Sequence, residues 1–370
     1  MISYDILEFQ GKIIGKFESK GKFYVELEKT NFYPDGKGGQ LGDRGFIGNA
    51  RVLSVKEDNS KVLHEVETLD IEENPTCIVD KERRLEIARE HTAQHILSQS
   101  FQKLYNIETL SFHMGENYST IDLNIEKLGD EKIEEAELLA NRIVLENREV
   151  KKYYINEDEL EKLNLRKKLE IKGPIRIVEV EGFDVSMCGG THVGKTGEIG
   201  IIKIIKVEKT KKDLTRIYFT SGLRTLRTFQ EKTKIIDEIS RILTTGESEL
   251  KTKINKLIIE NKKLLDLNKY LEEKFINEVI VKLYSQSEIK EVFENISRKS
   301  FEVIVHKTQS AGKSGFLALI DKESLLVAII NANIHLPYKS FDINGITFYT
   351  IEIVKKDEAL KRLLELKGGN

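Results

Sequence analysis

The chain has 370 residues, of which 39% are hydrophobic, enough for several domains with cores of their own. Its formal net charge is −2 although 32% of the residues are charged, so only a local basic surface could bind nucleic acid. No segment is apolar for the length of a membrane span, and the first residues lack a signal-peptide pattern. Two cysteines exclude a disulfide framework, and we therefore expect a cytoplasmic protein.

Residues 1–82 predict a small β-barrel domain. Short runs of alternating apolar and polar residues are separated by turn-forming residues, as in small barrels; they lie at 13–17, 23–27, 50–55 and 62–66. Between them, residues 36–45 contain five glycines and cannot form a strand interior. They predict a loop whose backbone can approach a ligand closely, or else a long hairpin connection.

Residues 83–224 predict a second domain in which helices are followed by strands. The strongest helix signal covers residues 81–105, and further helices are expected at 131–146 and 157–163. Strands are expected at 175–180, 200–207 and 215–220. This order is typical of the α+β class.

Two short motifs in this domain predict a metal site. His91 and His95 are four positions apart on the expected helix and therefore share a face. Cys188 and His192 are also four apart, in a turn that the glycines at 189 and 190 allow to bend tightly. Four nitrogen and sulfur ligands suit zinc, whereas three would suffice for a catalytic site with an open position.

The remaining residues predict a long helical segment, 225–280, and a small α/β domain, 281–370. The helix after residue 248 carries a heptad pattern whose core positions are Ile254, Leu257, Asn261, Leu264, Asn268, Leu271 and Phe275. It predicts a two-stranded coiled coil in a homodimer, or an antiparallel pairing with residues 225–243. In the last domain, strands are expected at 301–306, 315–321, 325–331 and 347–353, and a helix at 357–366.

Several motifs together resemble one known family. They are Phe32-Tyr33-Pro34 with Gly38-Gly39-Gln40 and Gly42-Asp43-Arg44-Gly45, His91-Thr92-Ala93-Gln94-His95, Phe112-His113-Met114-Gly115, Ile175-Arg176-Ile177-Val178, Cys188-Gly189-Gly190-Thr191-His192 and Arg216-Ile217-Tyr218-Phe219. In this order they resemble the alanyl-tRNA editing proteins of the AlaX family, in its long form, and the editing domain of alanyl-tRNA synthetase. The likeness is dense over residues 1–228.

The resemblance implies a hydrolase that deacylates alanine tRNA mischarged with serine, with glycine as the second candidate amino acid. It implies zinc as the cofactor, held by His91, His95, Cys188 and His192, and tRNA as the partner. Two segments rich in lysine and arginine, 203–216 and 162–168, are local candidates for contact with the tRNA, or are simply solvated faces.

Other polar residues of these motifs are candidates for the chemistry. Thr92, Gln94 and Thr191 neighbour the metal ligands, so each could read the seryl hydroxyl or hold the ester, or could orient an imidazole. The candidates for substrate binding are Gly38, Gly39, Gln40, Gly189, Gly190 and His113. For the glycine-rich loop to contribute, the first domain must dock on the second.

Two alternatives stay open. The editing domain of threonyl-tRNA synthetase shares the metal motif, so another mischarged tRNA could be the substrate. In the second alternative the zinc is structural in a tRNA-binding protein without hydrolase activity, and its removal should unfold the domain. We do not expect aminoacylation from these residues, because no adenylate-forming domain fits in the 90 residues before His91.

Overall fold

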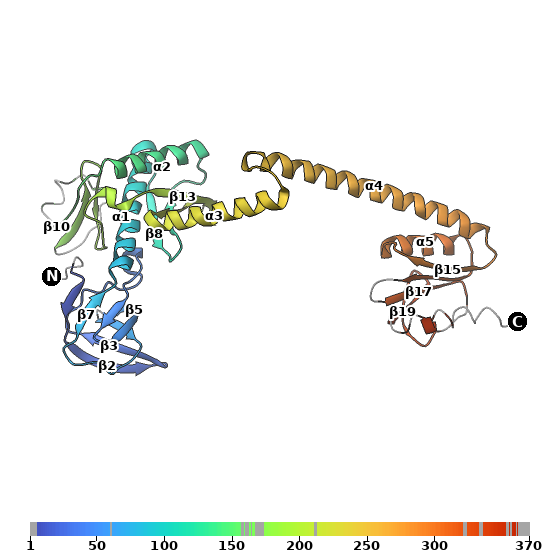
Figure 1. Ribbon diagram of the computed structural model, residues 1–370, viewed down its shortest axis with the longest axis horizontal. Coiled ribbons are helices and arrows are strands. Elements are labelled where there is room, and N and C mark those ends of the chain that lie inside the picture. The colour runs from blue at the N-terminus through green and yellow to red at the C-terminus, as the bar shows by residue number, and fades with distance from the viewer. Residues whose placement is uncertain are drawn as a thin grey trace. The chain divides into compact units, whose positions relative to one another are not determined.

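The computed structural model describes residues 6–352 except residues 60, 157, 158, 160–162, 164, 167–173, 211, 212, 321–323 and 333–335; beyond residue 352 it describes residues 355, 357–359 and 361. Two compact units are present, Met1–Asp237 and Glu238–Asn370. Both combine helices with sheets, so the predicted mixed α+β class is confirmed (Figure 1). None of the described helices has the length and apolar composition needed to cross a bilayer.

The first unit begins with a seven-stranded antiparallel sheet. Its strands are β1 (Glu8–Gln10), β2 (Ile13–Ser19), β3 (Lys22–Leu27), β4 (Gly45–Ile47), β5 (Ala50–Asp58), β6 (Lys61–Val66) and β7 (Thr76–Val79), in the order β1-β7-β4-β5-β6-β3-β2. The predicted closed barrel is wrong, because the outer strands β1 and β2 follow one another in the chain and do not pair. Their connection is instead bonded to the segment before β7: the N–H groups of Gly11 and Ile13 donate to the carbonyls of Pro75 and Glu73.

Helix α1 (Lys81–Tyr105) covers the residues predicted for it. Asp80 caps the first turn by accepting a hydrogen bond from the backbone N–H of Arg83, and Asn106, with φ of 54°, ends the helix in the left-handed conformation. The helix leads from the seven-stranded sheet into the rest of the unit (Figure 1). It therefore joins the glycine-rich part of the chain to the part that carries the Cys188 motif.

The other described strands and α-helices of this unit form two further sheets and two helices, the second of which continues from this unit into the next. They are β8 (Thr109–Met114), β9 (Ser119–Leu123), α2 (Asp130–Leu145), β10 (Val150–Ile155), β11 (Ile175–Val180), β12 (Asp184–Met187), β13 (Ile202–Lys209), β14 (Thr215–Ser221) and α3 (Gly222–Leu243). One sheet has the order β13-β14-β9-β8 and the other β10-β11-β12. The helix predicted at 157–163 lies almost entirely outside the described residues.

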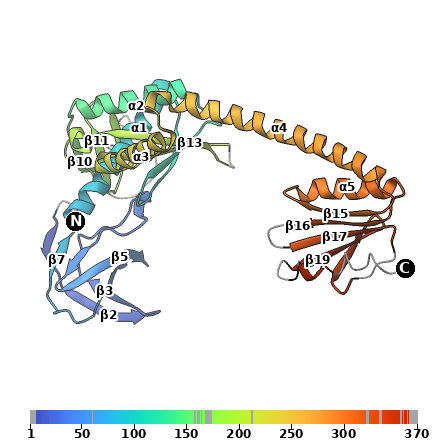
Figure 2. The ribbon, with the colours of Figure 1, turned by 45° about the vertical axis from the view of Figure 1, so that its right-hand side comes forward.

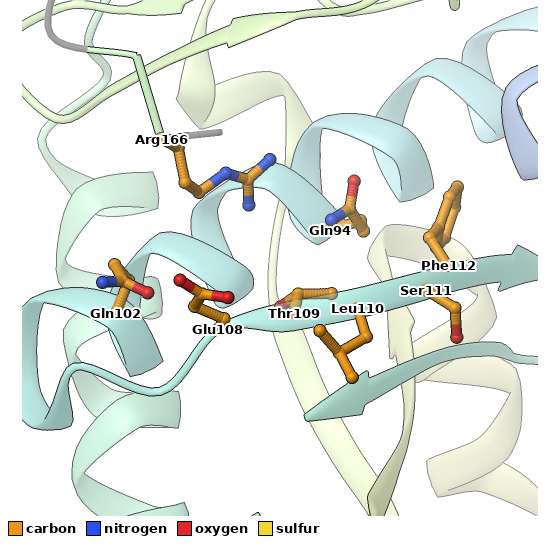
Figure 3. A pocket seen from close by; sticks show the side chains of 8 residues that line it. All are labelled: Gln94, Gln102, Glu108, Thr109, Leu110, Ser111, Phe112 and Arg166. Atoms are coloured by element: carbon orange, nitrogen blue, oxygen red, sulfur yellow. The ribbon is translucent and has the colours of Figure 1, made fainter. Parts of the chain in front are cut away.

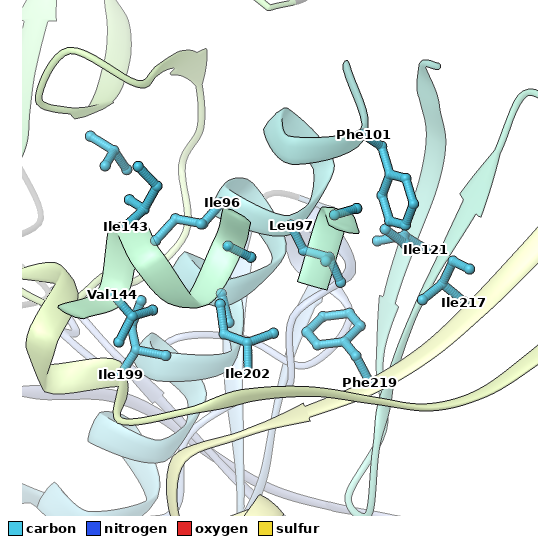
Figure 4. Close-up of a cluster of buried hydrophobic side chains, with 14 of the residues drawn as sticks. Ile96, Leu97, Phe101, Ile121, Ile143, Val144, Ile199, Ile202, Ile217 and Phe219 are labelled. Atoms are coloured by element: carbon cyan, nitrogen blue, oxygen red, sulfur yellow. The ribbon is translucent and has the colours of Figure 1, made fainter. Parts of the chain in front are cut away.

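A single apolar core joins α1 and α2 to the four-stranded sheet (Figure 4). Ile96 and Leu97 of α1 meet Ile143 of α2, and Phe219 of β14 closes the cluster from the sheet; all four are buried. Because interiors are close-packed, this core fixes α1 against the sheet and so fixes the positions of the histidines that α1 carries.

The second unit contains α4 (Leu250–Ser285), β15 (Ile289–Glu294), α5 (Arg298–Ser310), β16 (Gly315–Ile320), β17 (Ser324–Ile330), β18 (Lys339–Ile343) and β19 (Ile346–Glu352). The strand order is β15-β16-β17-β19-β18, and only the β15–β16 pair is parallel. Helix α5 and the end of α4 pack on one face of this sheet (Figure 2).

The strand predicted at 301–306 is wrong, since these residues lie in α5. The local alternation resembles a strand, but the buried positions Phe301, Ile304, Val305 and Thr308 have helical spacing. Ser297 starts the helix, because its side chain accepts a hydrogen bond from the N–H of Ser300. The helix predicted at 357–366 lies largely outside the described residues.

Helix α4 is 36 residues long and carries the predicted heptad. Its apolar side chains are exposed over most of its length; Leu264 is 64% exposed and Leu271 is 51% exposed. Only its last turns, at Ile276, Ile280 and Leu283, are buried against the second unit's own core. A helix with such a stripe needs a partner helix for most of its stability.

Candidate metal centre

The centre is built on α1, whose His91 and His95 are each only 2% exposed. Their four-residue spacing places both imidazoles on the same side of the helix, with ring centroids 5.4 Å apart. The surrounding helix positions are buried, so both imidazoles are shielded from bulk water.

Cys188 and His192 come from the turn that follows β12. Gly190 lies directly against the ring of His91: a side chain at this position would overlap the imidazole and the amide oxygen of Gln40. Glycine is therefore required here for the close approach of the turn to α1. Gly189, in contrast, is exposed, with nothing close to the position of a Cβ.

The four side chains converge on one point. The group consists of His91, His95, Cys188 and His192, whose possible ligand atoms all lie within 4.8 Å of one another. Among the described residues, this is the one group of His, Cys, Asp or Glu side chains placed in this way. The Cys188 Sγ is 3.4 Å from Nε2 of His91 and 3.3 Å from Nε2 of His192. Ligands of a tetrahedral zinc, at bond lengths of about 2.0–2.3 Å, lie about 3.5 Å apart. This group can therefore hold a metal ion.

Each histidine has a different partner for its second nitrogen. Nδ1 of His91 is 2.8 Å from Oε1 of Gln40, and Nδ1 of His95 is 3.1 Å from Oδ2 of Asp184. Nδ1 of His192 is 3.1 Å from Oγ1 of Thr92. If each Nδ1 carries the proton, each Nε2 is left with a lone pair for the metal, which is the usual arrangement around bound metals.

The Thr92 contact has a defined direction. Its hydroxyl donates to the carbonyl of Ala88 at 2.8 Å, so its oxygen accepts from Nδ1 of His192 and, at 3.3 Å, from the N–H of Val193. The side chain is fully buried. Thr92 thus touches a ligand and the backbone of the ligand turn.

The electrostatics of the centre suit a thiolate. Burial raises the pKa of Cys188, but the neighbouring imidazoles of His91 and His192 lower it more, and the net pKa lies well below that of a free thiol. Burial lowers the pKa of His192 well below its usual value. A deprotonated sulfur and neutral imidazoles are the forms that bind metals.

His95 is tied to a second charged pair. Burial lowers its pKa, but the hydrogen bond to Asp184 and the interactions with Cys188 together outweigh burial, so the net pKa is raised. Burial raises the pKa of Asp184, but the charge of Arg166 and the hydrogen bonds and charges of its other neighbours, His95 among them, outweigh burial and hold its pKa below the usual range. Nε of Arg166 is 3.3 Å from Oδ1 of Asp184, so the chain His95–Asp184–Arg166 runs outward from the centre.

A pocket of about 470 Å³ adjoins the centre (Figure 3). The residues that line it are Gln94, Gln102, Glu108, Thr109, Leu110, Ser111, Phe112 and Arg166. Phe112 lies where the pocket comes near the centre, because its ring is 5.2 Å from that of His91. The amide nitrogen of Gln94 donates to Oγ of Ser98, which holds the glutamine at the wall of the pocket.

The glycine-rich loop also reaches the centre. Gln40, buried in this loop, accepts from both His91 and the N–H of Thr191, and Gly39 packs directly against the backbone carbonyl of Phe112. An ion pair fixes the loop to α1: Asp43 accepts two hydrogen bonds from the guanidinium of Arg84. The seven-stranded sheet is therefore docked on the helix that carries the ligands.

Other predicted residues have separate positions. Thr191 is 4% exposed and its hydroxyl has no hydrogen-bond partner among the described residues, while His113 is exposed on β8, next to the inward-facing Phe112. The cations described in the segment 203–216 are paired with carboxylates; the pairs include Lys203–Glu137, Lys206–Glu208, Lys209–Glu126 and Arg216–Asp122, at 2.6–3.1 Å. The described part of that segment, which omits residues 211 and 212, is therefore not a stripe of unpaired positive charge.

A family model connects this region with aminoacyl-tRNA synthetases. The threonyl and alanyl tRNA synthetase second additional domain matches residues 175–218, which include Cys188 and His192. Alanyl-tRNA editing protein AlaX-L of Pyrococcus horikoshii is 37% identical over 235 residues, 60% of this chain and 57% of the relative. The resemblance to the alanyl-tRNA editing proteins is confirmed.

Two other relatives have related names. Alanyl-tRNA editing protein Aarsd1-A of Xenopus laevis is 32% identical over 247 residues, 66% of this chain and 60% of the relative. An alanine–tRNA ligase of Methanopyrus kandleri is 31% identical over 271 residues, 69% of this chain and 29% of the ligase. The chain thus spans 29–60% of the length of these three relatives.

Two residues of this AlaX-like centre were missed from the sequence. Asp184 lies four positions before Cys188, and a carboxylate so close to a ligand motif is a signal for an imidazole partner. Arg166 was noted only as one cation of a basic segment. Its role at the pocket depends on the tertiary structure, because no local pattern pairs residue 166 with residue 184.

Proposed function

We propose that this chain hydrolyses the ester of alanine tRNA charged with the wrong amino acid. Seryl-tRNA(Ala) is the preferred substrate and glycyl-tRNA(Ala) a second one. The observation that carries the proposal is the cluster of three histidines and Cys188 beside a pocket, in a chain related to alanyl-tRNA editing proteins. An aminoacyl ester is already activated, so positioning and modest electrostatic help suffice for its hydrolysis.

We propose zinc as the metal. The donor set of three imidazole nitrogens and one thiolate supports this choice, whereas magnesium and calcium prefer oxygen ligands. When bound, zinc supplies a Lewis acid that can lower the pKa of a water molecule or polarise a carbonyl. The protein's part is to hold His91, His95, Cys188 and His192 in place through Gln40, Asp184 and Thr92.

Selection of serine over alanine requires a group that reads the seryl hydroxyl. Gln94 and Thr191 are our candidates, because Gln94 lines the pocket and the buried hydroxyl of Thr191 has no partner among the described residues. A site built to bind a hydroxyl discriminates strongly against an analogue that lacks it. For Thr92 the contacts support an orienting role on His192, and we assign Gly39 of the loop and Gly190 of the turn to close backbone approach.

The test is deacylation of seryl-, glycyl- and alanyl-tRNA(Ala). Seryl-tRNA(Ala) should be hydrolysed at least tenfold faster than alanyl-tRNA(Ala), and Thr191→Val or Gln94→Leu should reduce that ratio while Thr92→Ser leaves it unchanged. Equal rates on the two tRNAs would remove the basis of the proposal. His113→Ala, on the exposed side of β8, serves as the matched control for a residue outside the pocket.

The threonyl-type alternative makes a different prediction. The matching family model describes a domain of both threonyl- and alanyl-tRNA synthetases, while the names of the relatives favour alanine tRNA as the substrate. Seryl-tRNA(Thr) should therefore be a poor substrate. A structural metal without hydrolysis predicts instead that chelation unfolds the first unit and that no ester is cleaved.

We also propose a homodimer through α4. The exposed apolar positions of the heptad support it, because a lone helix would leave this stripe in water. Asn261 and Asn268, at heptad core positions, favour a two-stranded pairing in register.

A further inference from the structure

The guanidinium of Arg166 lies at the boundary between the metal centre and the pocket. Figure 3 shows it pointing into the pocket towards Gln94, across from Thr109 of β8. Only 16% of its side chain is exposed. Arg166 is the one cationic residue among those that line this pocket, and Glu108 is the one acidic residue.

Three contacts hold this guanidinium in a fixed orientation. Nε lies 3.3 Å from Oδ1 of Asp184 and 3.2 Å from Oγ of Ser186, and Nη1 lies 3.4 Å from the carbonyl of His95. Asp184 and Ser186 thus engage the Nε edge. The planar group is left with its outer edge towards the pocket, where a fork of N–H groups suits a phosphate.

The pocket has the dimensions and lining of a nucleotide site. From Gln94 to Gln102 it follows α1 over eight residues, or about 12 Å. Its other polar walls, Thr109 and Ser111, are neutral, and Phe112 offers an aromatic ring of the kind on which bases stack. Apart from the exposed Glu108, the pocket is polar and uncharged around one fixed guanidinium, which suits a nucleoside that carries one negative group.

We propose that Arg166 binds the phosphate of the 3′-terminal nucleotide of the tRNA. The inference rests on the proposed function and adds to it the residue that anchors the substrate. With the phosphate at Arg166 and the nucleoside in the pocket, the aminoacyl ester lies towards Gln94 and Phe112, the lining residues that neighbour the metal centre. The contact supplies binding and orientation and takes no part in bond breaking.

The test compares adenosine with adenosine 5′-monophosphate as ligands of the metal-loaded full chain. The phosphate should improve binding by about 10- to 100-fold in the unmodified protein, the usual value of a charged hydrogen-bonded contact. Arg166→Gln should abolish this difference while leaving adenosine binding within about twofold. Arg89→Gln is the matched control, because Arg89 is on α1 but hydrogen-bonds the carbonyl of Glu198 away from the pocket.

The kinetics of ester hydrolysis distinguish phosphate binding by Arg166 from a purely structural role of Arg166 through its ion pair with Asp184. For seryl esters of the same two compounds, Arg166→Gln should raise KM for the phosphate-bearing ester about 10- to 100-fold and leave the kcat of both esters and the metal content unchanged. Equal losses on both esters together with lost metal overturn the inference in favour of a structural role. No preference for the phosphate, including failure of both ligands to bind, overturns it as well. If the phosphate preference is present and depends on Arg166 but no ester is cleaved, the proposed function fails and the anchor stands.

Discussion

Oε1 of Gln40 lies 2.8 Å from Nδ1 of His91, although 51 positions separate the two residues in the chain. The same oxygen accepts the backbone N–H of Thr191 at 2.9 Å. One side chain of the glycine-rich loop therefore orients a ligand on α1 and the turn that carries Cys188 and His192. The seven-stranded sheet thereby becomes part of the centre.

Gln40→Leu should lower metal affinity by about 10- to 100-fold, because His91 loses the acceptor that sets its orientation. The measurement is a competition titration with a chromophoric chelator. Gln10→Leu is the control, since the amide of Gln10 makes an exposed hydrogen bond to Thr76 within the same sheet. Unchanged affinity in Gln40→Leu would show that the contact does not position the ligand.

Substitutions of Thr92 can separate the effect of its hydroxyl group on metal binding from the effect of its side-chain volume. Thr92→Val keeps the volume but removes the acceptor of His192, so metal affinity should fall by about 10-fold or more. Thr92→Ser retains the hydroxyl and should stay close to the unmodified protein. If both variants bind metal equally well, the assigned contact to His192 carries no weight.

The buried pair of Arg84 and Asp43 should dominate the docking of the sheet on α1. Arg84 is 5% exposed and Asp43 is 0% exposed, so Arg84→Met leaves a buried carboxylate without its cation. The expected loss of unfolding free energy is about 3–5 kcal/mol, measured by urea denaturation. Arg51→Met, at an exposed site on β5, is the control; a similar small effect for both would contradict the assigned role.

The sequence alone predicted which four side chains come together, but not the groups that hydrogen-bond to them. Local spacing predicted that His91 and His95 share a helix face, and the limits of α1 agree with its capping residues. The contacts of Gln40, Asp184 and Arg166 depend on tertiary packing, which no periodicity records. In α5, the alternation of apolar and polar residues from Phe301 to His306 favoured a strand. The residues form a helix because Ser297 caps its first turn and its apolar face packs on the sheet.

His64 predicts acid sensitivity of the seven-stranded sheet. It is fully buried, its ring contacts Thr30 and the carbonyl of Val25, and burial lowers its pKa from 6.5 to about 4. The unfolded chain therefore binds the proton first, and folding stability should fall as the pH drops from about 6.5 to about 4, by at most about 3 kcal/mol. NMR titration of the His64 ring should give a midpoint near 4; a midpoint near 6.5 would contradict this assignment.

The proposed dimer predicts a change of molecular mass on substitution within α4. Light scattering should give the mass of two chains for the full protein and of one chain for Leu264→Glu/Leu271→Glu, because charges at heptad core positions oppose burial. Lys262→Glu/Lys269→Glu changes charge at other positions of the same helix and should leave the dimer intact. A monomeric full chain at micromolar concentration rules the pairing out.

The central claim is that the cluster at His91, His95, Cys188 and His192 holds a metal on which hydrolysis of seryl-tRNA(Ala) depends. The most direct measurement is the single-turnover deacylation rate and the zinc content of the same samples, for the unmodified chain and for Cys188→Ala. We predict about one zinc per chain and rapid hydrolysis for the first, and loss of both for the second with the fold retained by circular dichroism. Full activity in protein that contains no metal, or bound zinc without any hydrolysis, would contradict the account.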